Sequence, residues 1–355
     1  MMFYPQILSA VVLALAQISS AANATTCSCS NQLVRKEWRT LTDDEKLEYI
    51  SAVQCLLSTP AQLSDSLPGS VSRFDDYQGV HIALTEKYHF TGPFQPWHRV
   101  YVKLYETELR DICGYTGAQP YWDWTLDADS EEAFLAAPVF DNVTGFGGNG
   151  PYVNTTDYET TNVPVKIPYK TGGGCVEDGP FVNMSVNMGP GSSIEYNPQC
   201  LTRDFSPWLI TQTLNTSVID WGLSADSFAV YDYRTQGTGL EVSGMTFHAG
   251  GHLGVGGDIG IIGNMYSSPG DPLFYLHHAN LDRLWNEWQR ADWEARSVDI
   301  AGPDTMFAYP FDFMGDVAYT NITLDTILEF NNLTDNVAIS EVMDINCAAF
   351  CYTYA

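Results

Sequence analysis

The chain has 355 residues, of which 45% are hydrophobic and 13% aromatic, so it can form a substantial core and is not disordered. Its net charge of −27 comes from 43 acidic and 16 basic residues. This balance excludes nucleic acid and anionic membrane surfaces as expected partners, because both are bound by clustered lysines and arginines. No repeat, low-complexity tract or linker divides the sequence, which favours one domain over residues 23–355.

The N-terminus predicts secretion. An apolar run from Ile7 to Ala16 precedes the small residues Ser19 to Ala22, which is typical of a cleaved secretory signal over residues 1–22. No basic residue precedes the run, and a buried N-terminal helix is the alternative. No other stretch is long and apolar enough to span a bilayer, so we expect a soluble extracellular protein without a membrane partner.

Glycan acceptors and cysteines also indicate a secreted protein. Asn-X-Ser/Thr sequences, which predict N-linked glycans, occur at Asn23, Asn142, Asn154, Asn183, Asn215, Asn321 and Asn332. Eight cysteines allow four disulfides in an oxidising environment. Cys175 and Cys200 bracket a loop-like stretch and are expected to pair. We also expect Cys27 and Cys29 to form disulfides with Cys347 and Cys351, which would tie the two termini together.

The first third of the chain predicts three helices. "TDDEKLEYISAVQCLLS" from Thr42 has an N-cap residue, early acids and helical spacing of its apolar positions. A second helix is predicted from Pro68 and carries His81, and a third begins at His98. Pro93 and Pro96 keep the second and third helices apart.

The rest of the chain divides into loops, two helices and a tail. Residues 127–239 are rich in Gly, Asn, Pro and Thr and predict long surface loops with few regular elements. The helical pattern returns near Phe247 and from Pro272 to about Ala295, and an irregular, partly β-like tail follows.

The histidines form two groups. A single histidine on an apolar helix usually bonds a backbone carbonyl. The seven histidines of this chain are clustered instead, because the first group spans 18 residues and the second spans 31. In a helix, His248 and His252 project from one face and can converge on one ion. His277 and His278 point about 100° apart, so one ion takes only one of them, and helix geometry does not choose which. The first group comprises His81, His89 and His98.

Sites made only of imidazoles favour copper, zinc, iron or nickel. The residues between His248 and His252 include no glutamate, which excludes a zinc-protease motif. Six imidazoles split three and three suggest two ions. Two coppers could bind O2 and pass electrons, whereas two zincs would indicate a hydrolase. A structural glycoprotein with incidental histidines is the remaining alternative.

Two stretches resemble a known family. "HFTGPFQPWHRVYVKLYE" (residues 89–106) and "DPLFYLHHANLD" (residues 271–282) resemble the two copper-binding signatures of type 3 copper proteins, which comprise tyrosinases, catechol oxidases and hemocyanins. "SRFDDYQGVHI" and "YWDWTLDA" further resemble secreted fungal members, so the likeness covers most of residues 40–295.

The resemblance implies a mainly α fold, in which an antiparallel four-helix bundle holds a dinuclear copper site among long surface loops with minor β structure. It implies that His278, rather than His277, is the metal ligand, and that His277 is left over near the site. It also implies that Asp282 orients the His278 ring. It also implies two copper ions, O2 as co-substrate and oxidation of a small phenolic substrate from an o-diphenol to an o-quinone. The implied ligands are His81, His89, His98, His248, His252 and His278.

Other positions bear on the subtype. In the family, monophenol hydroxylation is associated with a water held by a glutamate and an asparagine, and the asparagine position is Ala249 here, while Leu253 follows His252. Glu241 is the candidate glutamate, and Met265 is a candidate gate over the metal pair. These residues favour oxidation of o-diphenols, with o-aminophenols as a further candidate class and weak or absent monophenol hydroxylation. A full tyrosinase and a hemocyanin-like O2 binding protein are the alternatives.

The C-terminal end resembles a family feature as well. Tyr352 to Tyr354 resembles the Tyr-X-Tyr that closes the catalytic domain of long fungal tyrosinases. A short form is therefore expected, without a C-terminal shielding domain and without proteolytic activation.

Overall fold

The computed structural model describes residues 29, 31–157, 162–347 and 349–355. The predicted signal peptide, Asn23 and Cys27 lie outside these residues. The described chain is mainly helical, as predicted. Its helices are α1 (Asp43–Ser58), α2 (Arg73–Tyr88), α3 (Phe94–Asp111), α4 (Glu131–Leu135), α5 (Pro207–Thr213), α6 (Thr216–Leu223), α7 (Phe228–Gln236), α8 (Phe247–Gly256), α9 (Leu273–Ala291) and α10 (Trp293–Arg296). Its strands are β1 (Leu33–Arg35), β2 (Ser185–Val186), β3 (Gln199–Cys200), β4 (Ile327–Leu328), β5 (Val337–Ala338) and β6 (Tyr352–Tyr354).

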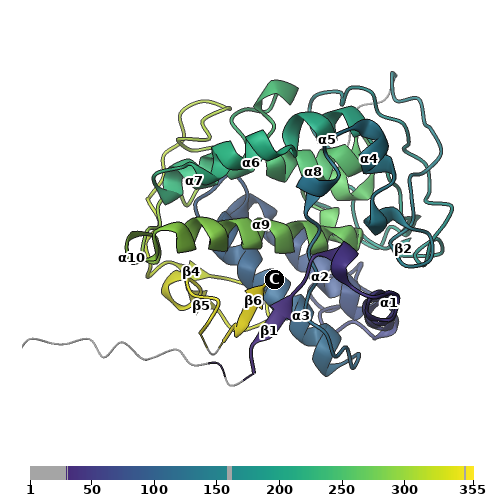
Figure 1. Cartoon of the computed structure of the whole chain (residues 1–355), viewed down its shortest axis with the longest axis horizontal. Coiled ribbons are helices and arrows are strands. Elements are labelled where there is room, and N and C mark those ends of the chain that lie inside the picture. Colours follow the sequence, from purple (N-terminus) through teal and green to yellow (C-terminus); the bar gives the residue numbers. More distant parts are fainter. Residues whose placement is uncertain (1–28, 30, 158–161, 348) are drawn as a thin grey trace, which may run out of the picture.

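The centre of the molecule is a bundle of α2, α3, α8 and α9, and these helices carry the histidines. Helix α3 packs against α2 and α9, and α8 packs against α9. Figure 1 shows α9 crossing the middle of the molecule, with α6 and α7 alongside it. Large aromatic rings fill the bundle core. Tyr105 on α3 stacks on Tyr275 of α9 with centroids 3.4 Å apart, and Trp97 stacks on Tyr101 at 4.7 Å.

Capping residues set where the early helices begin. Thr42 caps α1 in a capping box with Glu45, as the sequence predicts. Helix α2 begins at Arg73 rather than at Pro68, because the Ser72 hydroxyl accepts the backbone N–H of Asp75 and ends the preceding loop. Helix α3 begins at Phe94, four residues earlier than predicted. Pro96 is tolerated there because N–H groups in the first helical turn have no intrahelical partner.

The segment 127–239 is more regular than predicted. Residues 141–198 do run as loops with one short strand, but α5, α6 and α7 occupy most of residues 207–236. These helices were missed because each is short and its helical pattern is interrupted by caps and turns. The loops are tied to the bundle by Arg203, whose guanidinium bonds both carboxylate oxygens of Asp271 at the start of α9, at 2.8 and 2.9 Å.

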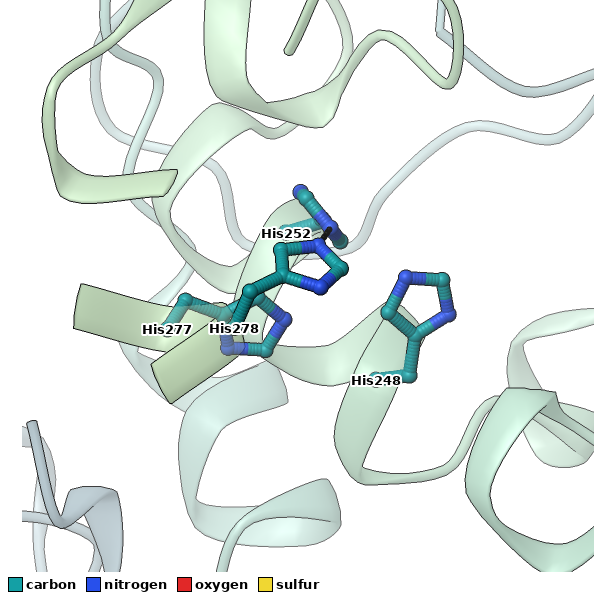
Figure 2. Close-up of side chains that lie close together, drawn as sticks. All are labelled: His248, His252, His277 and His278. Carbon is teal, nitrogen blue, oxygen red and sulfur yellow. Dashed lines mark hydrogen bonds between the residues drawn. The ribbon is translucent and has the colours of Figure 1, made fainter. Parts of the chain in front are cut away.

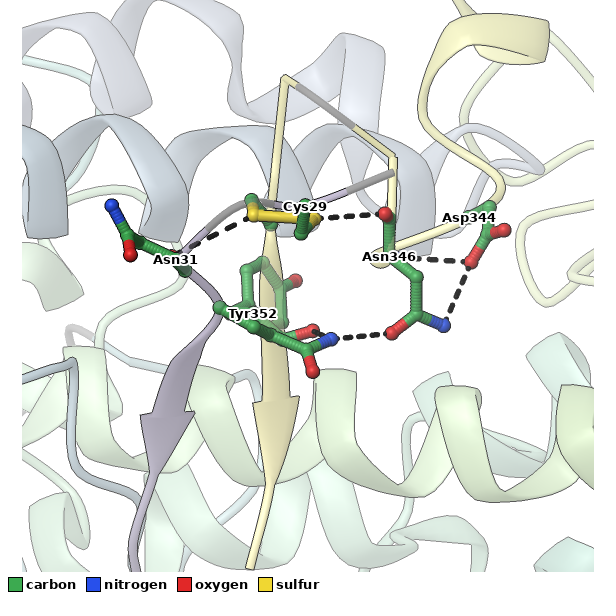
Figure 3. Close-up of a disulfide and its surroundings, with 7 residues drawn as sticks. Cys29, Asn31, Asp344, Asn346 and Tyr352 are labelled. Atoms are coloured by element: carbon green, nitrogen blue, oxygen red, sulfur yellow. Dashed lines mark hydrogen bonds between the residues drawn. A yellow bond between two sulfur atoms is a disulfide. The ribbon is translucent and has the colours of Figure 1, made fainter. Parts of the chain in front are cut away.

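The two ends of the described chain lie side by side. β1 pairs in parallel with β6, with Leu33 opposite Tyr352 (Figure 1). The disulfide Cys29–Cys351 closes this pairing, and Figure 3 shows it above the polar side chains around Asn346. The predicted pair Cys175–Cys200 is also present. Cys55–Cys113, which was not predicted, joins α1 to the residues after α3.

Among the described residues, no helix is long and apolar enough to cross a membrane. The glycan-acceptor asparagines in the described ranges are exposed, with the exception of Asn215. Asn215 is half-buried and caps α6, because its side-chain oxygen accepts the backbone N–H of Val218.

Candidate metal centre

The first histidine group forms where α2 ends and α3 begins. His81 lies on α2, His89 directly follows α2 as its C-cap, and His98 lies in the second turn of α3. Their ring centroids are 4.9 Å (His81–His89), 5.1 Å (His89–His98) and 5.7 Å (His81–His98) apart. All three residues are buried. The break between the two helices therefore serves to turn His89 back toward the other two rings.

The second group forms between α8 and α9. His248 and His252 share one face of α8, and His277 and His278 project from α9 (Figure 2). One ring nitrogen from each of the four lies within 4.8 Å of those of the others. Gly251 permits the close approach of the two helices. A Cβ at this position would lie 2.2 Å from Cε1 of His277, so any side chain there would push the ring away.

The hydrogen bonds of the rings leave their Nε2 atoms facing inward. The Nδ1 atoms of His81, His89, His98 and His252 each lie 2.7–2.9 Å from a backbone carbonyl oxygen. Each Nδ1 must therefore carry the proton, and each Nε2 carries the lone pair that binds a metal ion.

Several inward-facing nitrogens are unsatisfied. Nε2 of His81, Nε2 of His98 and both ring nitrogens of His248 are buried without a hydrogen-bond partner. In the second group, Nε2 of His252 and Nε2 of His278 lie 3.1 Å apart. A buried polar atom without a partner costs about 1–3 kcal/mol, so converging lone pairs of this kind indicate that a cation belongs between them. The donor set of nitrogens alone fits a first-row transition metal such as copper.

Burial keeps the imidazoles neutral. Removal from water lowers the pKa of His89 to about 3 and that of His252 to about 4. Burial, followed by repulsion from neighbouring rings, lowers the pKa of His81, His98 and His278 well below the ordinary value. A neutral ring is the form that coordinates a metal, so the site is ready for binding at neutral pH.

The adjacent histidines occupy different places. The His278 ring stacks on His98 of the first group, with centroids 4.3 Å apart and planes at 14°. The His277 ring lies 5.3 Å from Trp124 and 4.6 Å from His252, and has no ring contact with the first group. His278 thus lies between the two groups, while His277 lies behind the second one.

The structure corrects the role expected for Asp282. Its carboxylate does not contact the His278 ring, whose Nδ1 is buried without a partner. The carboxylate oxygens instead accept hydrogen bonds from four groups on other segments, which saturate them. These are Arg99 Nε (2.6 Å), Arg35 NH1 (3.3 Å), the Tyr352 hydroxyl (2.5 Å) and the Tyr354 hydroxyl (2.5 Å). Asp282 is therefore a structural link between α9, α3 and the β1–β6 pair.

A strained turn holds His89. The next residue, Phe90, has φ of 51°, a left-handed conformation that is unfavourable for a bulky side chain. The backbone N–H of Phe90 donates to Oε1 of Gln236 at 2.5 Å, and Nε2 of Gln236 donates to the Thr91 carbonyl and to Asp232. Gln236 therefore fixes the turn that presents His89. No local pattern in the sequence marks Gln236, because Phe90 and Thr91 lie about 145 positions away from it.

A cavity of about 290 Å³ opens beside His89, His248 and His252. Ala249, Leu253 and Met265 line it. Glu241 does not line it. Glu241 is exposed at the start of a short turn, and its neighbour Leu240 faces the cavity instead. Sequence analysis missed further lining residues from distant segments, among them Val163, Pro164, Gln236, Phe307 and Met314.

Comparisons with known proteins agree with this architecture. The common central domain of tyrosinase matches residues 71–291. The chain is 38% identical to an N-acetyl-6-hydroxytryptophan oxidase of Emericella nidulans, with 98% of both chains covered, and 35% identical to tyrosinase P of Aspergillus terreus, with 92% and 93% covered. The solved structure of a mutant polyphenol oxidase from Thermothelomyces thermophila superimposes with a TM-score of 0.79 and 33% identity, and covers 93% of this chain and 90% of its own. The chain therefore belongs to the tyrosinase family and is a tyrosinase-family oxidase.

Proposed function

We propose that this protein oxidises o-diphenols to o-quinones with O2, at two copper ions held by three imidazoles each. The observation that carries the proposal is the pair of buried, neutral histidine groups, which converge on each other beside an apolar cavity. Copper supplies the one-electron steps between its +1 and +2 states when it is bound. Each diphenol loses two electrons and two protons, and one O2 accepts four electrons and four protons from two diphenols to form two water molecules. The proposed ligands are His81, His89 and His98 for one ion and His248, His252 and His278 for the other.

The choice of His278 over its neighbour rests on its position. A dinuclear site requires the ligands of the second ion to face those of the first, and the His278 ring stacks on His98. His277 packs behind, against Trp124 and under Gly251. We infer that His277 supports the second group by packing and does not bind the ion.

The cavity walls favour diphenols over monophenols. A monophenol must lose its proton before it can be hydroxylated, and it needs a polar group or a held water to accept that proton. Ala249 and Leu253 supply no such group, Glu241 is exposed outside the cavity, and the side chain of Gln236 is committed to the turn at Phe90. Weak or absent monophenol hydroxylation is the expected consequence.

The proposed setting is extracellular. Three disulfides join described residues, and Cys347 is also disulfide-bonded, which requires an oxidising compartment. Five of the predicted glycan acceptors in the described ranges are exposed. Secretion through the predicted signal and N-linked glycosylation are therefore part of the proposal.

The experiment combines metal analysis with O2 uptake. Purified protein should contain two coppers per chain and consume O2 with 4-methylcatechol and with an o-aminophenol, while the matching monophenol, 4-methylphenol, reacts slowly or not at all. Because one relative is named for N-acetyl-6-hydroxytryptophan, a hydroxyindole belongs in the panel. Two coppers without turnover of any of these compounds would contradict the oxidase. Fast oxidation of the monophenol without a lag would contradict the preference for diphenols.

A further inference from the structure

We propose that Phe307 is a specificity-determining residue, because its ring separates the cavity from a second hollow and thereby disfavours phenols with long substituents. This inference rests on the proposed function for the identity of the reacting ring. It deepens that function by naming the class of substituent that the site accepts and the side chain that limits its length.

The loop that carries this ring, residues 304–320, is fixed at its base beside the first histidine group. Asp304 bonds Thr320 twice, because its backbone N–H donates to the Thr320 carbonyl at 3.0 Å and its Oδ1 accepts the Thr320 N–H at 2.9 Å. In the turn that follows α2, the N–H of Gly92 donates to the carbonyl of Pro303 at 2.8 Å. The loop therefore begins and ends on the same turn that presents the first histidine group.

An aromatic cluster holds the ring in place. Phe307 has φ of 57° and stacks on Phe90, which has φ of 51°, so two bulky residues in the left-handed conformation lie opposite each other. Their ring centroids are 5.0 Å apart, and Phe311 and Phe313 contact the same Phe90 ring at 5.8 and 5.9 Å. Such conformations persist only where the surroundings determine them, and they occur preferentially at functional sites. The Phe307 ring is thus a fixed part of its surroundings.

Phe307 forms a wall between two hollows. On one side lies the cavity beside the histidines. On the other side lies a surface hollow next to the last turn of α2, where Glu86 and Lys87 line it together with the start of the loop. Among the described residues, Met265 and Phe307 are the two that line both the cavity and the hollow. These two side chains therefore separate the reacting ring from the space beyond.

The volume of the cavity sets the substituent length at which this wall matters. A cavity of about 150 Å³ is sufficient to hold benzene. The cavity here has about 290 Å³, so a catechol ring with a substituent of up to about one further ring in volume fits behind the wall. A longer substituent meets Met265 and Phe307.

The two wall residues differ in how easily they move. Met265 is unbranched and adapts readily to a ligand. Moving Phe307 breaks its stacking on Phe90, which weakens the binding of a long ligand by about two- to tenfold. Phe307 is therefore the side chain that limits substituent length.

The test compares a short and a long catechol in the copper-loaded protein, namely 4-methylcatechol and 4-(3-phenylpropyl)catechol. Phe307→Ala should raise the ratio of kcat/KM for the long compound to that for the short one by at least about fivefold, mainly through KM, because the stacked ring no longer has to be displaced. Phe307→Leu refills part of the wall and should give a smaller rise. Phe307→Gly adopts the left-handed conformation without strain and replaces the alanine variant if that variant is unstable.

Phe313→Ala is the matched control. The Phe313 ring contacts the same Phe90 ring and is half-buried, as Phe307 is, but it lines neither the cavity nor the hollow. This variant should leave the ratio unchanged. An equal rise in Phe313→Ala and Phe307→Ala would show that a looser aromatic cluster, and not the missing wall, changes the specificity, and would overturn the inference.

Binding under nitrogen separates this inference from the proposed function. The copper-loaded wild type and both alanine variants are titrated with 4-methylphenol and 4-(3-phenylpropyl)phenol, and Kd is measured by calorimetry. A shift of the Kd ratio by at least about fivefold in Phe307→Ala alone would support the inference even if no catechol were oxidised, since binding requires no reaction. A Kd ratio that Phe307→Ala leaves unchanged would overturn the inference, and oxidation of 4-methylcatechol would still support the oxidase.

Discussion

Replacing Asp282 with asparagine should destabilise the fold and leave the metal site in place. Asp282 is buried and bonds two buried guanidiniums, those of Arg99 and Arg35, at 2.6 and 3.3 Å. Burial by itself would raise the pKa of this carboxyl, but the two arginines outweigh burial and hold the pKa below the ordinary value. The carboxylate is thus charged in the folded protein, and Asp282→Asn removes a charge that is already paired.

The magnitude follows from what the arginines retain. Arg35 keeps its ion pair with Glu106 at 3.1 Å. Arg99 keeps only neutral partners among the described residues, namely two backbone carbonyls and Gln289, each at 3.1 Å. Removing one partner of a buried pair costs about 3–5 kcal/mol, because a buried charge is left without compensation. We expect Asp282→Asn to lower the free energy of unfolding by about this amount, mainly through Arg99.

Guanidinium unfolding of the copper-loaded protein measures this loss, and elemental analysis of the folded protein measures its copper. Asp325→Asn is the control, because Asp325 is exposed and forms no ion pair in the described structure. The folded variant should still hold two coppers, since Asp282 does not touch the His278 ring. A loss below about 1 kcal/mol together with the loss of one copper would refute this reasoning and restore Asp282 as an orienting partner of His278.

Three other changes test the site. His278→Ala should reduce the copper content from two ions to one, while His277→Ala should keep both; equal losses in the two variants would contradict the assignment. Gln236→Leu leaves the N–H of Phe90 and the carbonyl of Thr91 without partners, and should cost about 2–4 kcal/mol in unfolding free energy. Gln236→Glu should cost at least as much, because it keeps the acceptor for Phe90 but places a second buried carboxyl group against Asp232. The copper-free protein should become less stable as pH falls below about 6.5, because the unfolded chain then takes up protons while folded His89, with a pKa of about 3, does not. Each such histidine removes up to about 1.4 kcal/mol per pH unit in this window, and unfolding midpoints that do not change between pH 7 and pH 5 would contradict it.

The sequence predicted the helices with strong local signals. Helix α1 was located by its cap at Thr42, α8 by the spacing of His248 and His252, and α9 by the apolar pattern after Pro272. These signals are readable because capping and helical periodicity act over a few residues. It missed α5 to α7, which are short, and it misplaced the start of α3 by four residues at Pro96. Helix ends depend on which nearby groups satisfy the terminal N–H groups, and that is decided in three dimensions.

By itself, the sequence determined the chemistry of the centre, because seven histidines in two clusters and two signature stretches define a donor set of imidazoles. Only the tertiary structure decided what surrounds that centre. It turned Asp282 away from the histidines toward Arg99, placed Glu241 at the surface, and brought Gln236 and Met314 to the cavity from distant segments. Metal ligands can be recognised from spacing along one helix, whereas a cavity wall is assembled from loops that meet only after the chain has folded.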